Sequence, residues 1–301
     1  MRIVGADGGF IAPTDGAFVQ ALNAAFVEGG PVAAIDTFNL ICVPGLTDVV
    51  ATAMLQAYAV GHRAFLIADC EESATVASAP ASLAGKNGAN AANSALYFPW
   101  VIAPDPLNGS PRAFPPCGFV AGIYARTDDA RGVWKAPAGE SIVDATGLTA
   151  TVSNADQELL NPLGINCLRN LPVRGLVVWG ARTLAGADAQ ASEWKYVNVR
   201  RFMMFVEQSI DAGTKWAVFE PNGEPLWAKL RASVGNFLDG LWRSGALIGN
   251  TPTQSFFVRC DGTTTTQADI DNGMLNIVIG VAPVQPAEFV IIRIAQFAAA
   301  S

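Results

Sequence analysis

The chain has 301 residues, of which 26 are acidic and 19 are basic, so its formal net charge is -7. This length suits one large domain or two ordinary ones and excludes a small disulfide-stapled fold, because a chain of about 300 residues buries roughly three quarters of its unfolded surface. Only 15% of the residues are charged and 51% are hydrophobic, whereas soluble domains carry about 25% charged residues. Two explanations of this low charged fraction remain: extensive burial against other protein, or the packed core of an Ala- and Gly-rich α/β enzyme.

A membrane span and a nucleic-acid surface are both excluded. The longest stretch without a charge, residues 87–104, contains asparagines and prolines that a span of about 20 apolar residues would not tolerate. No basic segment followed by an apolar one opens the chain, so no secretory signal is visible. An acidic chain without a basic stripe does not match the phosphate backbone of nucleic acid.

The first half of the chain alternates strand-like and helical patterns. We expect strands at 38–43, 64–68, 97–103 and 119–124, and helices at 15–27, 47–60 and 87–95, with Thr47 as the N-cap of the second helix. Residues 104–118 contain five prolines and are expected to form a stiff surface loop. This alternation predicts βαβ units around a mostly parallel sheet with helices on its faces.

The second half combines two long helices with further strands. The helices are expected at 193–212 and from Pro225 to about 243, and the strands at 175–179, 216–219, 256–259, 275–281 and 289–294. We therefore predict an α/β protein, α+β overall, with a first domain over 1–170 and a second over 171–301 that has a mixed sheet and ends in a strand arm at about 287–301. A terminal strand needs an edge to pair with, and that edge can belong to another molecule.

No catalytic or cofactor motif is found in the sequence. The nearest phosphate-loop candidate, residues 85–88, lacks the upstream glycine and the following Ser or Thr of a P-loop, and a calcium-like run at 269–273 lacks the closing Glu. His62 is the only histidine and follows a helix end, where it is expected to cap carbonyls. The five cysteines form no CxxC pair, and Cys42, Cys70 and Cys260 lie in apolar runs typical of core thiols.

Several long segments resemble one family, the sheath proteins of contractile tails, found in contractile-tailed phages, tailocins and extracellular contractile injection systems. The resemblance covers nearly the whole chain and keeps the order of the family's segments. They are FNLICVPG (38–45), YFPWV (97–101), PPCGFVAGIYARTDDARGVWKAPAGE (115–140), LNPLGINCLRN (160–170), RGLVVWGARTL (174–184), WKYVNVRRFMMFVEQSI (194–210), FFVRCD (256–261) and DIDNGMLNIVIGVAPVQPAEFVIIRIAQF (269–297).

The resemblance implies a structural role with no catalysis, cofactor or metal. Sheath subunits form hexameric rings stacked helically around an inner tube, and contraction of this lattice drives the tube through a target envelope. The implied partners are other copies of the chain, the inner tube protein, and the baseplate and tail terminator proteins. The implied location is a phage tail or injection particle assembled in the bacterial cytoplasm, without direct contact to nucleic acid or insertion into a membrane.

The resemblance also implies two sets of functional residues. In the family, a C-terminal arm joins the sheet of a neighbouring subunit. Sheaths also contact the tube through basic residues on a helix; the alternative for these residues is an ordinary solvated face or ion pairs within the subunit. The implied arm residues are Glu288, Phe289, Val290, Ile291, Ile292, Arg293 and Ile294, and the tube-facing candidates are Arg200, Arg201, Lys229 and Arg243.

The chain departs from the family pattern at its start. The N-terminal arm and the outer domains of the family have no counterpart in it, which fits a truncated chain, a naturally minimal paralogue or a chain whose leading part is missing. Two other functions remain open. One is a sheath-like terminator or baseplate-proximal ring, and the other is an α/β nucleotide-binding or enzymatic module with a polar pocket at the carboxyl ends of its strands.

Overall fold

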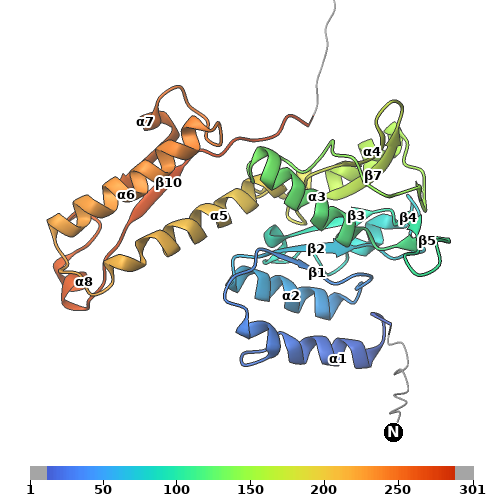
Figure 1. The fold of residues 1–301 in the computed structure, drawn as a ribbon, viewed down its shortest axis with the longest axis horizontal. Helices are drawn as coiled ribbons and strands as arrows, with labels where there is room; N and C mark the ends of the chain where they lie inside the picture. Colours follow the sequence, from blue (N-terminus) through green and yellow to red (C-terminus); the bar gives the residue numbers. More distant parts are fainter. Residues whose placement is uncertain (1–11, 289–301) are drawn as a thin grey trace, which may run out of the picture.

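The computed structural model describes residues 12–288 of the chain. This part is elongated, with a sheet-containing body at one end and an extension built on two long helices at the other (Figure 1). The helices are α1 (Gly16–Ala25), α2 (Val49–Gly61), α3 (Pro116–Arg131), α4 (Asn154–Leu160), α5 (Val197–Thr214), α6 (Glu224–Arg243), α7 (Pro252–Ser255) and α8 (Gln267–Asp271). The strands are β1 (Leu40–Cys42), β2 (Phe65–Asp69), β3 (Ser94–Phe98), β4 (Val101–Pro104), β5 (Pro111–Phe114), β6 (Gly147–Leu148), β7 (Ile165–Leu171), β8 (Gly175–Trp179), β9 (Phe256–Arg259) and β10 (Val278–Val281).

The body is organised around a five-stranded sheet. Its spatial order is β1-β2-β3-β7-β8; the first four strands run parallel and β8 pairs antiparallel with β7. Every residue of β2 and β3 is buried, as expected of central strands covered on both faces. The mostly parallel sheet that the sequence predicted for the first half is confirmed.

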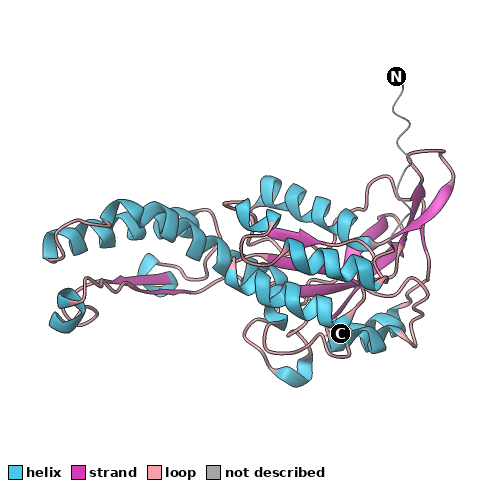
Figure 2. Cartoon of the chain, turned by 90° about the horizontal axis from the view of Figure 1, so that it is seen from below, coloured by secondary structure: helices cyan, strands magenta, loops and turns pink. Residues whose placement is uncertain are grey.

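Helices cover both faces of this sheet. Because successive strand residues point to opposite faces, Phe65 and Ile67 of β2 pack with α3, whereas Leu66 between them packs with α2. Helix α1 lies on the outer side of α2 and contacts it through Phe18 and Leu22 (Figures 1 and 2). Because β2 is apolar on both faces, it packs against a layer of helices on each side of the sheet.

The extension is held together by the apolar stripes of its two long helices. Phe202 and Val206 of α5 share a core with Val234 and Leu238 of α6, at the spacing that an amphipathic helix requires. The antiparallel pair β9–β10 packs against the same core. The predicted helices at 193–212 and 225–243 and the predicted strand at 256–259 are confirmed, and the strand predicted at 275–281 is found as the shorter β10.

The strand predicted at 119–124 is wrong, because these residues lie in the middle of α3. The helix starts at Pro116, whose fixed φ angle and missing N–H suit the first helical turn. Its buried residues include Val120, Ile123 and Thr127, which recur at intervals of three and four residues as on a helical face. The apolar run at 119–124 also matched a strand, because six residues are too few to reveal the helical period.

Two further predicted elements are replaced by turns. The strand predicted at 216–219 is instead a short 3-10 helix, Lys215–Ala217, followed by a turn at 218–219, in which Phe219 is fully exposed with φ +71°. The helix predicted at 87–95 consists of turns, a short 3-10 segment at Ala91–Asn93, and the start of β3. In both segments the local sequence preference did not decide the structure.

The region around residues 97–171 differs from the sequence prediction in its strands. The strand expected at 97–103 is divided at Pro99 into β3 and β4, because proline cannot donate to a ladder. The expected loop at 104–118 contains β5, which pairs with β4 in a three-stranded sheet β5-β4-β6. Strand β7 was not predicted, and the domain boundary expected at residue 170 falls inside it, next to its partner β8.

Individual residues were predicted with mixed success. Asp48 rather than Thr47 caps α2, and its carboxylate accepts from the Ala51 N–H at 2.7 Å. His62 is the C-cap of α2, as expected. Cys70 and Cys260 are buried, whereas Cys42 is exposed, contrary to its prediction as a core thiol. None of the helices between residues 12 and 288 combines the length and the hydrophobicity of a transmembrane span, and no cluster of three or more His, Cys, Asp or Glu side chains that could hold a metal ion is found in this range.

Candidate arm-anchoring site

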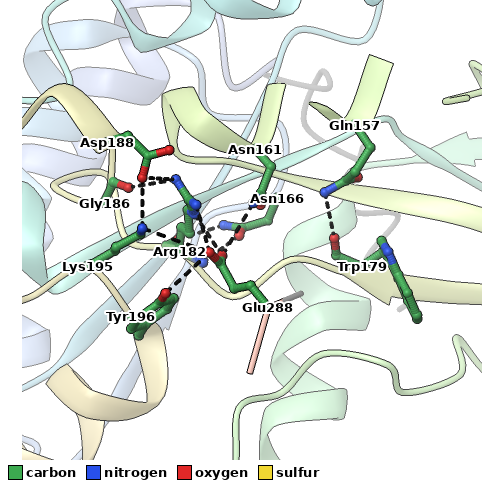
Figure 3. A network of polar contacts seen from close by, with 10 residues as sticks. All are labelled: Gln157, Asn161, Asn166, Trp179, Arg182, Gly186, Asp188, Lys195, Tyr196 and Glu288. Atoms are coloured by element: carbon green, nitrogen blue, oxygen red, sulfur yellow. Dashed lines mark hydrogen bonds and ion pairs between the residues drawn. The ribbon is translucent and has the colours of Figure 1, made fainter. Parts of the chain in front are cut away.

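The chain returns from the extension to the body just before its described part ends. After β10 it crosses back to the body, with the Ala282 N–H donating to the Ser255 carbonyl at 2.9 Å and the Val284 N–H to the Ala246 carbonyl at 3.2 Å (Figure 1). Glu288 is the last described residue and the first residue of the predicted arm. Its carboxylate lies in a network of polar side chains on the body (Figure 3).

The centre of this network is a bidentate ion pair between Arg182 and Glu288. Nε of Arg182 donates to Oε1 of Glu288 at 2.8 Å, and Nη2 donates to Oε2 at 2.7 Å. The Arg182 side chain is 1% exposed and that of Glu288 is 15% exposed. A planar guanidinium matches a carboxylate in this geometry, and such charge-assisted pairs are about twice as strong as neutral hydrogen bonds.

The backbone of Arg182 is fixed by an asparagine on the neighbouring strand. The side chain of Asn166 on β7 accepts from the Arg182 N–H at 2.6 Å and donates to the Arg182 carbonyl at 2.7 Å. This close approach requires a glycine at position 180, because a Cβ there would lie 2.8 Å from Oδ1 of Asn166 and 2.9 Å from its Cα. Asn166 thus fixes the backbone from which the guanidinium extends.

Other polar groups complete the network around the pair. Asp188 accepts from Nη1 of Arg182 at 3.0 Å and from Nζ of Lys195 at 2.7 Å. The Tyr196 hydroxyl and the Asn161 amide each donate to Glu288 at 3.3 Å. The groups come from the end of α4, from the segment after β8 and from the start of α5 (Figure 3), so Glu288 is tied to several elements at once.

The electrostatics of the site keep both partners charged. Burial by itself would raise the pKa of Glu288, but the hydrogen bonds and charge of Arg182, with smaller contributions from Asn161 and Lys195, leave this pKa below its ordinary value. Burial disfavours the charged form of Arg182, yet Glu288 and Asp188 raise its pKa overall. Removing one partner of such a buried pair typically costs about 3–5 kcal/mol, because the other charge stays buried.

The predicted tube-facing arginines on α5 are engaged within the body. Arg201 is 3% exposed, and its two terminal nitrogens donate to Asp128 of α3 at 3.0 and 2.5 Å. Nε of Arg200 donates to the Asn93 side chain at 2.7 Å, and its guanidinium lies over the Trp194 ring at 4.8 Å. The two side chains therefore hold α5 against the body in this structure.

The two predicted residues on α6 are exposed. Lys229 has no ion-pair partner within residues 12–288, and Arg243 is 72% exposed and pairs with Asp239 one turn earlier at 2.6 Å. Screening by solvent makes such an exposed pair weak. Both side chains are available to a partner. Of the predicted arm residues, Phe289, Val290, Ile291, Ile292, Arg293 and Ile294 lie outside the described residues.

Sequence reasoning did not single out Arg182 or Asn166. Both lie in segments that resemble the sheath family, yet neither belongs to a motif that marks an anchor. An arginine three residues after a predicted strand is expected to lie on an ordinary surface. Only the pairing of β7 with β8, and the return of the chain at residue 282, bring Arg182 and Glu288 together across 106 positions.

The small β9–β10 sheet has open edges. Among the described residues, these two strands pair only with each other. Phe257 of β9 and Val278 of β10 are half exposed, at 50% and 44%. Unpaired edges beside exposed apolar side chains are a template for an added strand from another chain.

Comparison with known proteins identifies the family. The model of the phage tail sheath protein central domain matches residues 14–184, and that of the phage tail sheath C-terminal domain matches residues 189–297. The tail sheath protein of Vibrio phage KVP40 is 28% identical over 189 residues, which cover 62% of this chain and 27% of that protein. The chain spans between about a quarter and a half of the length of the curated tail sheath proteins that it matches.

Solved structures agree with the sequence comparison. The helical sheath of the anti-feeding prophage in its contracted state has a TM-score of 0.77 and 33% identity, covering 95% of this chain and 76% of that chain. A chain of the anti-feeding prophage baseplate has a TM-score of 0.74 and 35% identity, covering 88% and 70%. Because the two family models together match nearly all of residues 14–297, this chain belongs to the phage tail sheath protein family.

Proposed function

We propose that the chain is a structural subunit of a contractile sheath. It would polymerise as stacked hexameric rings around an inner tube and contract to drive the tube through a target envelope, with no catalytic activity of its own. The observation that carries this proposal is the likeness over 95% of the chain to a helical sheath in a contracted state. Baseplate and tail terminator proteins would be its further partners, in a particle assembled in the bacterial cytoplasm.

The proposed contraction needs rigid subunits and strong links between them. Residues 289–294, with the sequence FVIIRI, have high strand propensity and follow directly on the anchored Glu288. In our proposal they pair with an open edge of the β9–β10 sheet of a neighbouring copy. We place the boundary between the two domains at residues 184–189, between the segments that the two family models match. Strand β8 then belongs to the same domain as the rest of the body.

The contact with the tube is proposed to use the exposed cations of α6. Lys229 and Arg243 would face acidic groups on the tube surface, where electrostatic complementarity steers association and fixes register. Arg200 and Arg201 are not included in this contact, because their hydrogen bonds within the subunit already use their guanidinium groups. Charge reversal at Lys229 and Arg243 should therefore weaken binding to the tube and leave the subunit folded.

Negative-stain electron microscopy of the purified chain tests the function. Stacked rings or tubes are expected from the full chain, alone or with its tube protein. Deletion of residues 289–301 should leave a folded subunit, measured by its thermal unfolding, that no longer forms these assemblies. A full chain that stays monomeric at all concentrations, with and without the tube protein, would contradict the proposal. Unimpaired assembly of the truncated chain would refute the role of the arm.

A second candidate is a baseplate-proximal ring, which the likeness to a chain of the anti-feeding prophage baseplate favours. Such a subunit would form single rings that do not stack. The same micrographs distinguish the two functions, because the number of stacked layers is visible directly.

A further inference from the structure

Two cysteines from separate elements meet at the carboxyl ends of strands β1 and β2. Cys42 is the last residue of β1, and Cys117 lies in the first turn of α3, a helix that contacts β1. The two side chains form a hydrogen bond with each other. Cys42 is exposed and Cys117 is buried. A thiol that solvent can reach therefore has a second thiol within hydrogen-bond reach.

A buried carboxylate holds the two segments together. Asp69 is the last residue of β2, and its Oδ1 accepts from the Cys117 N–H at 2.8 Å while its Oδ2 accepts from the Gly45 N–H at 2.9 Å. A Cβ at Gly45 would lie 3.6 Å from Cγ of Pro115, so the turn after β1 packs against the start of α3. The backbones of both segments thus fix the two cysteines beside each other.

The two thiols ionise very differently. The hydrogen bond from the Cys117 thiol lowers the pKa of Cys42 to about 7, although burial and the charge of Asp69 oppose this shift. The same hydrogen bond, together with burial and Asp69, raises the pKa of Cys117. At neutral pH a large fraction of Cys42 is therefore thiolate, which is the nucleophilic form of cysteine, while Cys117 keeps its proton.

The other three thiols do not share these properties. Cys70, Cys167 and Cys260 are all buried. Burial raises the pKa of each of them, to about 12 for Cys70 and Cys167. Such thiols react slowly, because little thiolate is present and reagents do not reach it. Of the five cysteines, all within the described part of the chain, Cys42 alone combines exposure, ionisation and a neighbouring thiol.

We propose that Cys42 is a peroxide-reactive site and that Cys117 then forms a disulfide bond with it. In the first step the Cys42 thiolate attacks one oxygen of hydrogen peroxide. The S–O bond forms, the O–O bond breaks, and hydroxide leaves and takes up a proton. In the second step the Cys117 sulfur attacks the sulfur of the Cys42 sulfenic acid. The S–S bond forms, the S–O bond breaks, and water leaves with the Cys117 thiol proton. The two sulfurs together lose two electrons, which the peroxide gains.

Oxidation of Cys42 makes Cys117 easier to deprotonate. The hydrogen bond to Cys42 is the largest cause that raises the pKa of Cys117, and the thiolate charge behind it is gone once Cys42 is a neutral sulfenic acid. The Asp69 carboxylate, which also forms a hydrogen bond with the Cys117 side chain, can take up the thiol proton and pass it to the departing hydroxide. The resulting bond joins the edge strand β1 to α3.

Peroxide treatment of the full-length, fully reduced chain tests the proposal. With a small excess of hydrogen peroxide at pH 7.5, the free thiols counted in denaturant should fall from five to three. Proteolysis and mass spectrometry should find one linked pair of peptides, which contain Cys42 and Cys117. On a denaturing gel without reductant the product should run as a single chain, and dithiothreitol should restore all five thiols.

Three variants separate the roles of the two cysteines, and thermal unfolding shows that each is folded. Cys42→Ser should keep its four remaining thiols under peroxide. Cys117→Ala should stop at the Cys42 sulfenic acid, which a cyclic 1,3-dione traps. Its Cys42 should also react with iodoacetamide at pH 7 about threefold more slowly, because the hydrogen bond that favours the thiolate is lost. Cys167→Ala removes a buried thiol outside the pair and is the matched control, which should form the same linked peptides as the wild type.

The proposal is overturned if the wild-type chain keeps five free thiols, or if Cys42→Ser loses thiols as fast as the wild type. Linkage of Cys42 to any other cysteine, in the same chain or in a second one, would equally overturn it. A loss of thiols that dithiothreitol does not reverse would mean that Cys42 is oxidised beyond the sulfenic acid before Cys117 reaches it, which contradicts the second step.

Discussion

The hydroxyl groups of Tyr97 on β3 and Tyr124 on α3 lie 2.6 Å apart in the core of the body. Both side chains are fully buried, and burial raises the pKa of both hydroxyls. The guanidinium of Arg201 lies 4.7 Å from the centre of the Tyr124 ring. A single cluster therefore joins the sheet, the helix that covers it and the first helix of the extension.

The tyrosine pair gives a prediction about stability. Tyr124→Phe should destabilise the chain by about 1–3 kcal/mol, because the Tyr97 hydroxyl is left buried without a partner. The double variant Tyr97→Phe, Tyr124→Phe should recover part of this loss, since no polar group is then orphaned. Urea unfolding of both single variants and the double variant measures the coupling. Strictly additive losses would show that the hydroxyls do not interact.

The arm anchor gives a second prediction. Glu288→Gln should cost about 1.5–3 kcal/mol at neutral pH, less than for an isolated pair because Asp188 still contacts Arg182. Glu158→Gln, an exposed acid on α4, is the matched control and should change stability by less than about 0.5 kcal/mol. Urea unfolding provides the comparison.

The same variant has a predictable pH dependence. The folded-state pKa of Glu288 is lowered, so its stabilisation is present above the ordinary glutamate pKa and is lost as the pH falls through the folded-state value. The unfolding free energies of the wild type and Glu288→Gln should therefore converge in acid. A constant difference between pH 7 and pH 3 would exclude an ionised Glu288.

A buried aspartate predicts the opposite pH dependence. Burial raises the pKa of Asp69 to about 6, although the N–H groups of Gly45 and Cys117 donate to its carboxylate and partly oppose the rise. The penalty for ionising this group appears as the pH rises from about 4 through 6, and amounts to about 3 kcal/mol. Asp69→Asn should thus gain stability relative to the wild type between pH 4 and pH 7.5. Urea unfolding at both pH values measures it, and parallel profiles would contradict the assignment.

Glycine 180 gives a prediction about close packing. Gly180→Ala should destabilise the chain by about 1–3 kcal/mol, because its Cβ would meet Asn166 at 2.8 Å and displace the side chain that fixes Arg182. Gly240→Ala is the control: it lies in α6 with nothing within 4 Å of the new Cβ, and should stabilise by about 0.5–1 kcal/mol. Thermal unfolding of both variants compares them, and a neutral Gly180→Ala would mean that the sheet adjusts at this point.

The sequence predicted the layered part of the fold well, because buried parallel strands and amphipathic helices leave long apolar patterns. Strand β2 and helices α5 and α6 were found for this reason. Short apolar runs were ambiguous, and 119–124 and 216–219 were assigned wrongly since four to six residues do not reveal a period. Strand β7 was missed because its residues, INCLRNL, mix polar and apolar types without alternation.

The candidate site was predictable only in part. Glu288 was identified from its position at the start of the arm, but its partner Arg182 was not, because a contact between residues so distant in sequence depends on the tertiary fold. Arg200 and Arg201 were selected as basic residues on a long helix, because the family resemblance implies that such residues contact the tube. Their partners, Asn93 and Asp128, come from elements packed against α5, and no pattern within α5 distinguishes a buried arginine from a solvated one.

The fixed position of Glu288 sets a distance limit on subunit linkage. A chain extends by at most about 3.3–3.6 Å per residue, so the proposed arm strand at residues 289–294 reaches no further than about 22 Å from the Arg182 ion pair. In the proposed linkage, the neighbouring edge that pairs with this strand would have to stay inside that radius throughout a lattice rearrangement. The ion pair would then be the fixed end of a tether that limits how far two linked subunits can separate.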